Sequence, residues 1–403
     1  MRTTLISFLG NSRQSGDYRR VRYRYQGETL APVTYIGYAL RKVLQPERFV
    51  ILGTTGSMWD HLFESDLELE GQHEEERLAL MESVEEGTCV TQAQLDKLAP
   101  LLSKALGSEV ILKIIPPART EEEQIELLGQ IESVLEDGPG KLYLDVTHGY
   151  RSMPMVSFAA VQFLNTVKPE IQVENIFYGE LGHDGDPVTG CINELSGLLS
   201  LNQWNKAFSH SELTGDYSLI AALIPEDEEL AELISDGSFY ESIHLTKRAR
   251  STFAKARQRL EGKEFTGPAA LFKPVLLKRT KWVEEPYASQ RQEVQAFQSL
   301  ENSDYLRAAL YGYEAYLTSR MQADPDYRSW VGDDNARTDF AKKLRNSNSF
   351  NDAGEKEQFR LLRLLRNAFA HGEQSLRREH QPVVESSKQL NIKLKKALEV
   401  LLR

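Results

Sequence analysis

The sequence has little cysteine and no long apolar run. Its two cysteines, Cys89 and Cys191, provide neither a disulfide framework nor a zinc-binding pattern, which fits a reducing compartment. No apolar stretch approaches the roughly 18 residues of a membrane-spanning helix. The first ten residues hold too short an apolar run for a signal peptide. We therefore expect a cytoplasmic protein without a membrane segment.

Positive charge is outnumbered, because 48 Lys and Arg residues stand against 59 Asp and Glu residues and give a formal net charge of −11. This argues against an indiscriminate nucleic-acid binder, so any nucleic-acid site must be a local basic patch. No G-x-G-x-x-G pattern follows the first predicted strand, which gives no support to a dinucleotide-dependent dehydrogenase. The length favours two or three domains, and an apolar fraction of 41% suffices for ordinary cores.

Strand and helix patterns alternate over the first 200 residues. This alternation predicts an α/β, Rossmann-like domain whose mostly parallel sheet is covered by helices on both faces. Residues 64–87 carry ten acidic residues against one Arg, which we interpret as a solvated helical face. The predicted strands are 4–9, 21–26 (in a hairpin), 48–53, 109–115, 141–146 and 171–178, and the predicted helices are 33–44, 92–106, 120–135 and 153–166.

Small and polar residues follow the carboxyl ends of these strands, where ligands bind in open α/β sheets. The richest segment is 145–154, DVTHGYRSMP, in which Gly149 lets the backbone approach a ligand. Ser152 is a candidate cap for the next helix, whose start favours an anion. The alternative is a tight turn with a structural Asp145. The candidate ligand-binding residues are Gly10, Asn11, Ser12, Thr54, Thr55, Gly56, Ser57, Thr147, His148, Gly149, Arg151, Ser152 and Tyr178.

Residues 362–372 form a second motif, an apolar helical stripe that ends at Gly372. Arg366 suits a phosphate, His371 exchanges protons near neutral pH, and Asn367 can orient either group. Because Arg366 and His371 lie roughly 140° apart on an ideal helix, either the last turn unwinds or a second copy completes the site. The alternative is a buried helix with a solvated His371 and Arg366 as a surface charge.

Both motifs resemble those of known families. Residues 366–372, RNAFAHG, resemble the Arg-x4-His signature of HEPN ribonucleases. Residues 144–154 resemble the Asp-x-Thr-His-Gly-x-Arg-x-x-Pro signature of CARF domains, and the loop at 52–57 is similar to the matching loop of that family. The segment 204–216 resembles the one that follows the sheet in CARF–HEPN proteins. This combination marks the ancillary ribonucleases of type III CRISPR systems.

The resemblance implies a homodimer, or a higher oligomer, whose CARF domains bind a cyclic oligoadenylate and whose HEPN domains then cleave single-stranded RNA. The catalytic residues would be Arg366, Asn367 and His371, with no metal or cofactor and with 2′,3′-cyclic phosphate and 5′-hydroxyl products. The small-residue loops favour cyclic tetra-adenylate as the activator, and no stable DNA binding is expected. A different class stays open, a protein that binds or degrades the cyclic nucleotide while its HEPN domain only dimerises.

The second half of the sequence is predicted to be all-α. We expect a CARF sensor domain at 1–200, a helical and basic connecting region at 201–285 and a HEPN domain at 286–403. The segment 247–281 holds eleven Lys and Arg against two acidic residues, which indicates either a solvated helix facing the acidic domain or an RNA-guiding surface. The sequence also predicts helices at 195–217, 248–260, 295–321 and 387–402, breaks at 267–268 and 273–274, and core positions for Tyr305, Tyr311, Tyr313 and Tyr316.

Overall fold

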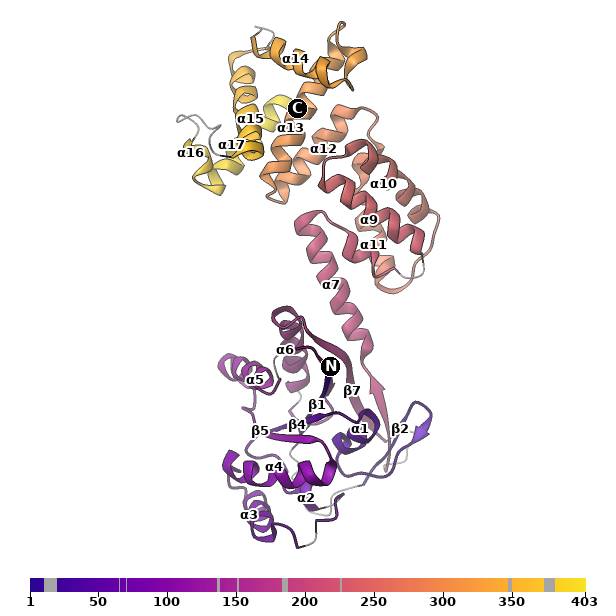
Figure 1. Cartoon of the computed structure of the whole chain (residues 1–403), viewed down its shortest axis with the longest axis vertical. Coiled ribbons are helices and arrows are strands. Elements are labelled where there is room, and N and C mark those ends of the chain that lie inside the picture. The colour runs from indigo at the N-terminus through magenta and orange to yellow at the C-terminus, as the bar shows by residue number, and fades with distance from the viewer. Residues whose placement is uncertain are drawn as a thin grey trace. The chain divides into compact units, whose positions relative to one another are not determined.

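The chain folds into two compact units, Met1–Asn202 and Gln203–Arg403 (Figure 1). The expected division of the second half at about residue 285 stays a prediction. The computed structural model describes residues 1–10, 20–64, 66–69, 71–135, 138–150, 152–182, 188–224, 227–346, 350–372 and 381–403.

An eight-stranded sheet forms the centre of the first unit, in the order β3-β2-β8-β7-β6-β1-β4-β5. The five strands β7-β6-β1-β4-β5 pair in parallel, whereas β8 is antiparallel to β7 and parallel to β2, which forms a hairpin with β3. The mostly parallel α/β prediction is therefore confirmed. The strands are β1 (Arg2–Leu9), β2 (Arg22–Tyr25), β3 (Glu28–Thr29), β4 (Arg48–Gly53), β5 (Glu109–Ile114), β6 (Gly140–Asp145), β7 (Ile171–Leu181) and β8 (Thr189–Glu194).

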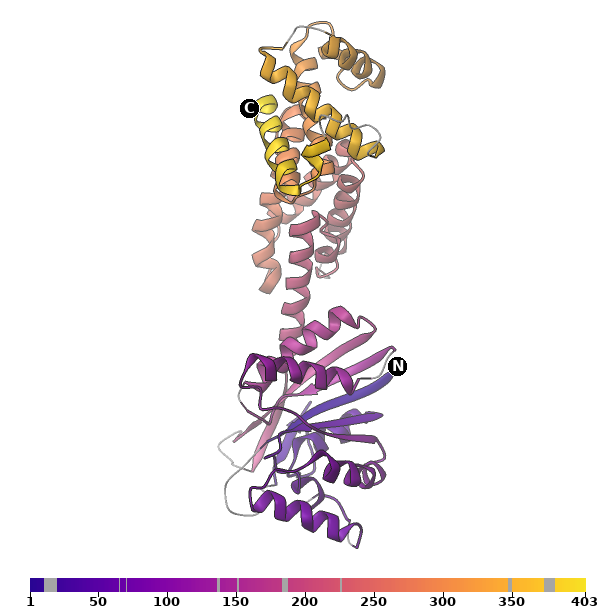
Figure 2. The same cartoon turned by 90° about the vertical axis from the view of Figure 1, so that its left-hand side faces the viewer.

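Helices cover both faces of this sheet (Figure 2). Successive side chains of a strand point to opposite faces, so Leu5 and Leu9 of β1 enter one core, and Ile6 and Phe8 enter the other. The first core is closed by α1 and α4, and the second by α5 and α6. The helices of this unit are α1 (Ile36–Leu44), α2 (His61–Glu64), α3 (Glu74–Glu85), α4 (Gln92–Leu106), α5 (Glu121–Ser133) and α6 (Met153–Val167).

The chain reverses its direction across the sheet at β1. Apart from the β2–β3 hairpin at the far edge, the chain passes from β1 to β4 and β5 on one side, and it then returns to β6 and β7 on the other side. A crevice between loops that leave in opposite directions is the usual ligand site of such sheets. The carboxyl ends of β1 and β6 therefore meet at the switch point of the fold.

Two expectations for the first unit need correction. The acidic stretch 64–87 is not one solvated helix, because α3 is the only helix among its described residues beyond Glu64, and Leu69 is buried in the core. The strand β8 was not predicted, since Ile192 is its only deeply buried large side chain and the pairing with β7 holds it.

The second unit is helical, as predicted, and contains two apolar cores. One core joins α7, α8, α9, α10 and α11, and the other joins α12, α13, α14, α15 and α17. Three of the four tyrosines expected in the core, Tyr311, Tyr313 and Tyr316, are buried, and Tyr305 is partly buried against the same core. The helices are α7 (Ser196–Thr214), α8 (Ser218–Ala221), α9 (Glu228–Ser242), α10 (Thr246–Glu261), α11 (Gly267–Arg279), α12 (Ala288–Glu301), α13 (Tyr305–Ala323), α14 (Asp334–Asn346), α15 (Ala353–His371), α16 (Gln381–Val384) and α17 (Ser387–Leu402).

The predicted long helix at 295–321 is wrong. It is two helices, α12 and α13, separated by a turn in which Ser303 has a left-handed φ of 59°. The Asp304 side chain accepts a hydrogen bond from the Arg307 N–H at 2.9 Å and so caps α13. The predicted break at Lys273-Pro274 is also wrong, because α11 runs through Pro274, which is exposed.

Close packing between α9 and α10 provides a test of this core. A Cβ on Gly237 would lie 2.7–3.0 Å from three ring carbons of Phe253, which is fully buried. Gly237→Ala should therefore destabilise the helical unit by about 1–3 kcal/mol through overpacking.

Gly129→Ala is the matched control, because Gly129 of α5 is exposed and a Cβ added to it would have no neighbouring atom within 4 Å. At this position the higher helix propensity of Ala should raise the free energy of unfolding by about 0.5–1 kcal/mol. Denaturant unfolding of both variants measures the two shifts, and a stabilised Gly237→Ala protein would contradict the packing.

Candidate functional site

A buried carboxylate organises the switch point between β1 and β6. The register of the two strands places Ser7 beside Asp145, which is fully buried. The Ser7 hydroxyl donates to Asp145 Oδ2 at 2.5 Å, and the Thr147 N–H and hydroxyl donate to Oδ1 at 3.0 and 2.5 Å. The Tyr35 hydroxyl donates to Ser7 Oγ at 2.6 Å, and the Gly179 N–H donates to Thr147 Oγ1 at 2.8 Å. One chain of hydrogen bonds thus joins β1, the start of α1, β6 and β7.

The electrostatics of this network follow from its burial. Burial raises the pKa of Asp145 above its ordinary value, while the neighbouring His148 and the three hydrogen-bond donors oppose that shift. Burial also lowers the pKa of His148, and the charge of Asp145 opposes this. The Tyr35 ring stacks on the His148 imidazole with 6.0 Å between centroids and 28° between planes. Asp145 therefore holds the loop, and half-buried His148 lies at the edge of the site.

The loop after β4 is tied to the end of β1. Ser57 Oγ accepts from the Thr54 N–H at 2.9 Å and donates to the Leu9 carbonyl at 2.9 Å. The Trp59 indole N–H donates to the Thr54 carbonyl at 2.8 Å. Ser57 is only 2% exposed and Thr54 only 8%, so these side chains shape the loop. Thr55 and Gly56 are exposed at its tip and are the residues that a ligand can reach.

The remaining predicted ligand-binding residues that the structure describes lie around the same edge of the sheet. A Cβ on Gly10 would be 3.5 Å from His148 Cβ and 3.6 Å from the Gly149 nitrogen, so the loops after β1 and β6 touch. Gly149 has a φ of +104°, which favours glycine. Ser152 occupies the N-cap position of α6, but the expected capping hydrogen bond from its side chain is not formed. Tyr178 is 42% exposed on β7, and Asn11, Ser12 and Arg151 lie outside the described residues.

The Arg366-Asn367-His371 motif lies in the last two turns of α15. The helix stays regular to its end, because the N–H of Gly372, with a φ of 84°, donates to the Ala368 carbonyl at 2.8 Å. Unwinding of the last turn, one of the two options left by the sequence, is therefore not found. Arg366 and Asn367 are half-buried, whereas His371 is exposed. Within one chain, Arg366 and His371 consequently face different directions.

The Arg366 guanidinium lies 5.3 Å above the centroid of the Tyr313 ring, in a cation–π contact. Its Nη1 donates to Asn367 Oδ1 at 3.0 Å, whereas its buried Nε has no hydrogen-bond partner among the described residues. Burial raises the pKa of Tyr313, and the positive charges of Arg366, Arg363 and Arg337 oppose this shift. The Glu314 carboxylate, which pairs with Arg337, also raises this pKa. Two arginines of α15, Arg366 and Arg363, therefore lie near the same tyrosine as an ion pair between α13 and α14.

Comparison with known proteins identifies the first unit. Residues 4–181 match the family model described as "CRISPR system endoribonuclease Csx1, CARF domain". The first unit is a CARF domain. The resemblance read from residues 144–154 is thereby confirmed for the first unit of the chain.

Two further relatives are similar over larger parts of the chain. CRISPR-associated protein MJ1674 of Methanocaldococcus jannaschii is 25% identical over 299 residues, which are 66% of this chain and 45% of that protein. The chain thus matches less than half the length of that relative. The solved structure of Enterococcus italicus Csm6 bound to cyclic hexa-2′-fluoro-hexa-dAMP has a TM-score of 0.38 and 12% identity, covering 99% of this chain and 94% of Csm6.

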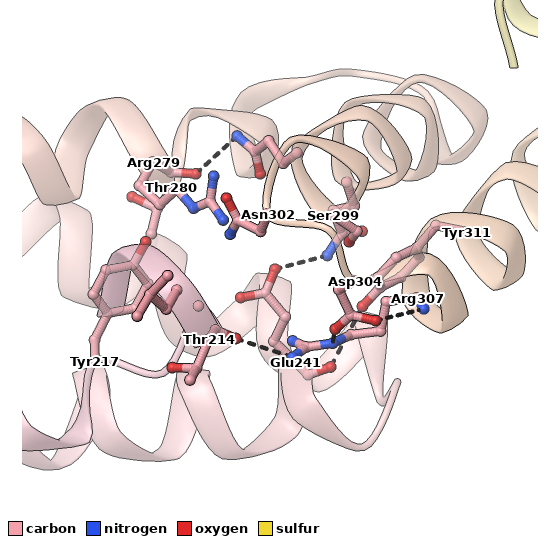
Figure 3. Close-up of a pocket in the computed structure, with 14 residues that line it drawn as sticks. Thr214, Tyr217, Glu241, Arg279, Thr280, Ser299, Asn302, Asp304, Arg307 and Tyr311 are labelled. Carbon is pink, nitrogen blue, oxygen red and sulfur yellow. Dashed lines mark hydrogen bonds and ion pairs between the residues drawn. The ribbon is translucent and has the colours of Figure 1, made fainter. Parts of the chain in front are cut away.

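The connection from the CARF domain enters the second unit as the C-terminal half of α7. There Arg307 Nη2 donates to the Thr214 carbonyl at 2.9 Å, and the Arg307 guanidinium also pairs with Asp304 (Figure 3). Both contacts lie beside a cavity of about 20 Å³, enough for a water molecule. Burial raises the pKa of Glu241 in the same pocket, where Gln295 Nε2 donates to it at 3.0 Å. Arg307 therefore fastens the end of α7 to the start of α13.

Two other features are absent from the described part of the chain. No group of three or more His, Cys, Asp and Glu residues is arranged to hold a metal ion there. None of the helices seen is both long and apolar enough to span a bilayer.

Sequence reasoning missed the residues that hold the CARF site together. Ser7 and Tyr35 belong to no sequence motif. Ser7 reaches the Asp145 carboxylate only because β1 pairs with β6. Gly179 does have a local signal, because a glycine inside an apolar strand indicates that another part of the chain approaches closely. A Cβ there would lie 2.2 Å from Ile36 Cδ1.

The hydrogen-bond chain at Asp145 gives a testable stability difference. Thr147→Val keeps the shape of the side chain but removes the hydroxyl between Asp145 and the Gly179 N–H. The CARF domain should lose about 1–3 kcal/mol, because a buried acceptor and a buried donor lose a partner. Thr55→Val, at the exposed tip of the neighbouring loop, should change stability by less than about 0.5 kcal/mol. Equilibrium denaturation measures both, and equal shifts would show that the network does not stabilise the edge.

Proposed function

We propose that this protein is a cyclic oligoadenylate-activated, metal-independent endoribonuclease that cleaves single-stranded RNA in type III CRISPR antiviral defence. One observation carries the proposal. The same chain pairs a CARF domain with a helix that presents an exposed His371 and Arg366, whose guanidinium contacts the Asn367 amide oxygen and the Tyr313 ring. A guanidinium for the phosphate and an imidazole for the proton are the groups that this reaction requires.

The activator site is proposed at the edge where β1, β4, β6 and β7 end. Thr55, Gly56, His148 and Gly149 line it among the described residues, and the sequence adds Asn11, Ser12 and Arg151. Hydroxyl groups, backbone N–H groups and Arg151 suit the ribose and phosphate groups of a cyclic oligoadenylate. A symmetric ring fits a two-fold dimer, because each protomer presents the same patch. Cyclic tetra-adenylate is the ring size that we favour.

The catalytic groove is proposed to form between two copies of α15. An intact helix directs Arg366 and His371 to different sides, so a single chain does not bring both to one phosphate. In a homodimer, the arginine of one protomer and the histidine of its partner can act on the same phosphodiester. Asn367 then orients the Arg366 guanidinium through the bond to its Oδ1.

The proposed reaction uses the 2′-hydroxyl of the RNA as its nucleophile. The 2′-oxygen forms a bond to phosphorus while the bond from phosphorus to the 5′-oxygen breaks. A His371 imidazole takes the proton of the 2′-hydroxyl, and an imidazolium gives a proton to the departing 5′-oxygen. Arg366 stabilises the negative charge that develops on the phosphate oxygens. The products are a 2′,3′-cyclic phosphate and a 5′-hydroxyl, and no metal-bound water is needed.

Activation requires that the ligand bind the active arrangement of the dimer more tightly than the resting one. The residues after the CARF domain are the only covalent route to α15, and α7 is the first helix on it. Arg307 joins the end of this helix to α13, which also carries Tyr313 beneath Arg366. We propose that this joint transmits the change in the CARF dimer to the catalytic groove.

The chemistry is tested with the full-length protein, single-stranded RNA and a panel of cyclic oligoadenylates. One ring size should stimulate cleavage, EDTA should leave the rate unchanged, and an all-deoxy substrate should stay intact. His371→Ala should abolish cleavage while the dimer persists, because the proton-transfer group is lost. Lys356→Ala, an exposed charge on the same helix, should cleave normally. Mass spectrometry identifies the product ends.

Other results would contradict this mechanism. Strong inhibition by EDTA, or DNA cleavage at a similar rate, would point to a metal-dependent nuclease. Cleavage by His371→Ala protein would place the site elsewhere. Ligand binding without any RNA cleavage would favour the alternative class, in which the helical unit serves only dimerisation and the CARF domain binds or degrades the cyclic nucleotide.

The coupling joint is tested by Arg307→Gln, which removes the charged contact to the Thr214 carbonyl. Stimulation of RNA cleavage by the ligand should fall about fivefold or more, while ligand affinity measured by calorimetry changes less. Gln322→Ala is the matched control, because Gln322 also lies on α13 and joins it to another helix, where its Oε1 accepts from the Ser289 hydroxyl of α12 at 2.9 Å, away from α7 and α15. An equal loss in both variants would mean that α13 is merely destabilised.

A further inference from the structure

The basic segment 247–281 divides into two parts with different surroundings. Its middle is neutralised within the protein. Arg259 Nε lies 2.7 Å from Asp227 Oδ1, and Lys263 Nζ lies 3.1 Å from Asp227 Oδ2. Arg257 is buried and pairs with Glu284. These charges stabilise the fold of the helical unit, and the structural interpretation of the basic segment holds for them.

The first turns of α10 differ, because their cations have no acidic partner in the described part of the protein. Lys247, Arg248 and Arg250 are all exposed. The Arg248 guanidinium lies 5.7 Å from the centroid of the Tyr240 ring, and Arg250 Nε donates to the Val283 carbonyl at 3.3 Å. Both contacts fix the direction of a side chain without removing its charge.

These three residues form one wall of a groove with a volume of about 750 Å³, which we call the α10 groove. Arg291 of α12 and Arg337 of α14 also line it, so that five Lys and Arg residues face two acidic residues, Glu314 and Asp334. Glu314 pairs with Arg337, which leaves the rest of the lining strongly positive. Burial and the nearby charge of Arg250 lower the pKa of Arg291, so two cations face each other here.

The α10 groove is also connected to the proposed catalytic motif. Arg337 lies on the groove wall and pairs with Glu314 of α13, whose neighbour in the chain, Tyr313, lies beneath the Arg366 guanidinium. The groove and the catalytic motif therefore both contact helix α13. The protein as a whole is acidic, with a net charge of −11, so a concentrated cationic groove is a local exception.

We propose that the α10 groove binds the phosphate backbone of single-stranded RNA beside the cleavage site. Lys247 and Arg248 contact phosphates outside the scissile bond and position the strand without taking part in the chemistry. This inference rests on the proposed ribonuclease function, because it assigns that substrate to the groove. Sequence-independent contacts of this kind supply affinity that falls with salt.

RNA binding, measured apart from cleavage, tests the groove. The full-length His371→Ala protein and a labelled single-stranded RNA of about 20 nucleotides are titrated by fluorescence anisotropy at several salt concentrations. Lys247→Ala and Arg248→Gln, each added to His371→Ala, should weaken binding about five- to tenfold and reduce the salt slope by about 0.7 per lost phosphate contact. Lys255→Ala is the matched control, because it removes an exposed charge of the same helix that does not line the groove.

The outcomes separate this inference from the proposed function. Equal weakening by Lys255→Ala, or none by the groove variants, would overturn the groove assignment even where the wild-type protein cleaves RNA. Groove-dependent binding of RNA that the wild-type protein never cleaves would support the groove and refute the nuclease. If the groove variants lose binding of poly-glutamate yet keep full RNA affinity, the groove serves an acidic protein partner and the proposal is wrong.

Discussion

The buried carboxylate of Asp145 is the constraint on which the CARF edge depends. A buried charge is tolerable only when hydrogen-bond donors surround it. Three donors are supplied here, one by Ser7 of β1 and two by Thr147 in the loop after β6. The same bonds determine where the loop after β6 leaves the sheet and how His148 stacks on Tyr35. The exposed tips of the loops are therefore placed by a polar core beneath them, as expected of a preorganised binding site.

Local signals explain why much of the fold could be predicted from the sequence. The strand at 48–53 is a short, fully buried run, and the helix at 92–106 has a capping box at Thr91 and Gln94 and a left-handed Gly107 at its end. The prediction failed in two places for different reasons. The apolar periodicity continues from α12 into α13, and it hid the local signals that separate these helices, the left-handed Ser303 and the cap at Asp304. The second failure depends on a distant partner. Strand β8 exists because β7 offers it an edge.

In the candidate sites, too, the type of a residue could be predicted from the sequence, whereas its burial and its distant partners could not. The sequence predicts residues 145–149 and 366–371 as sites because the functional residue types follow one another within a short segment. Sequence could not separate Ser57, which holds the loop, from Thr55, which a ligand can reach, because that depends on burial. Ser7 is 138 positions away from the carboxylate that it binds. Likewise, the two parts of the basic segment differ only through acidic residues elsewhere in the chain, such as Asp227.

The unbroken last turn of α15 has a consequence for control in the cell. In the proposed ribonuclease, Arg366 and His371 must come from different copies to meet at one phosphate, so an isolated chain would be inactive however well it is folded. Cleavage by dilute protein would then rise with the square of its concentration, until the dimer is saturated. Low abundance would itself act as a safeguard against the destruction of the host's own transcripts, independent of any signal molecule.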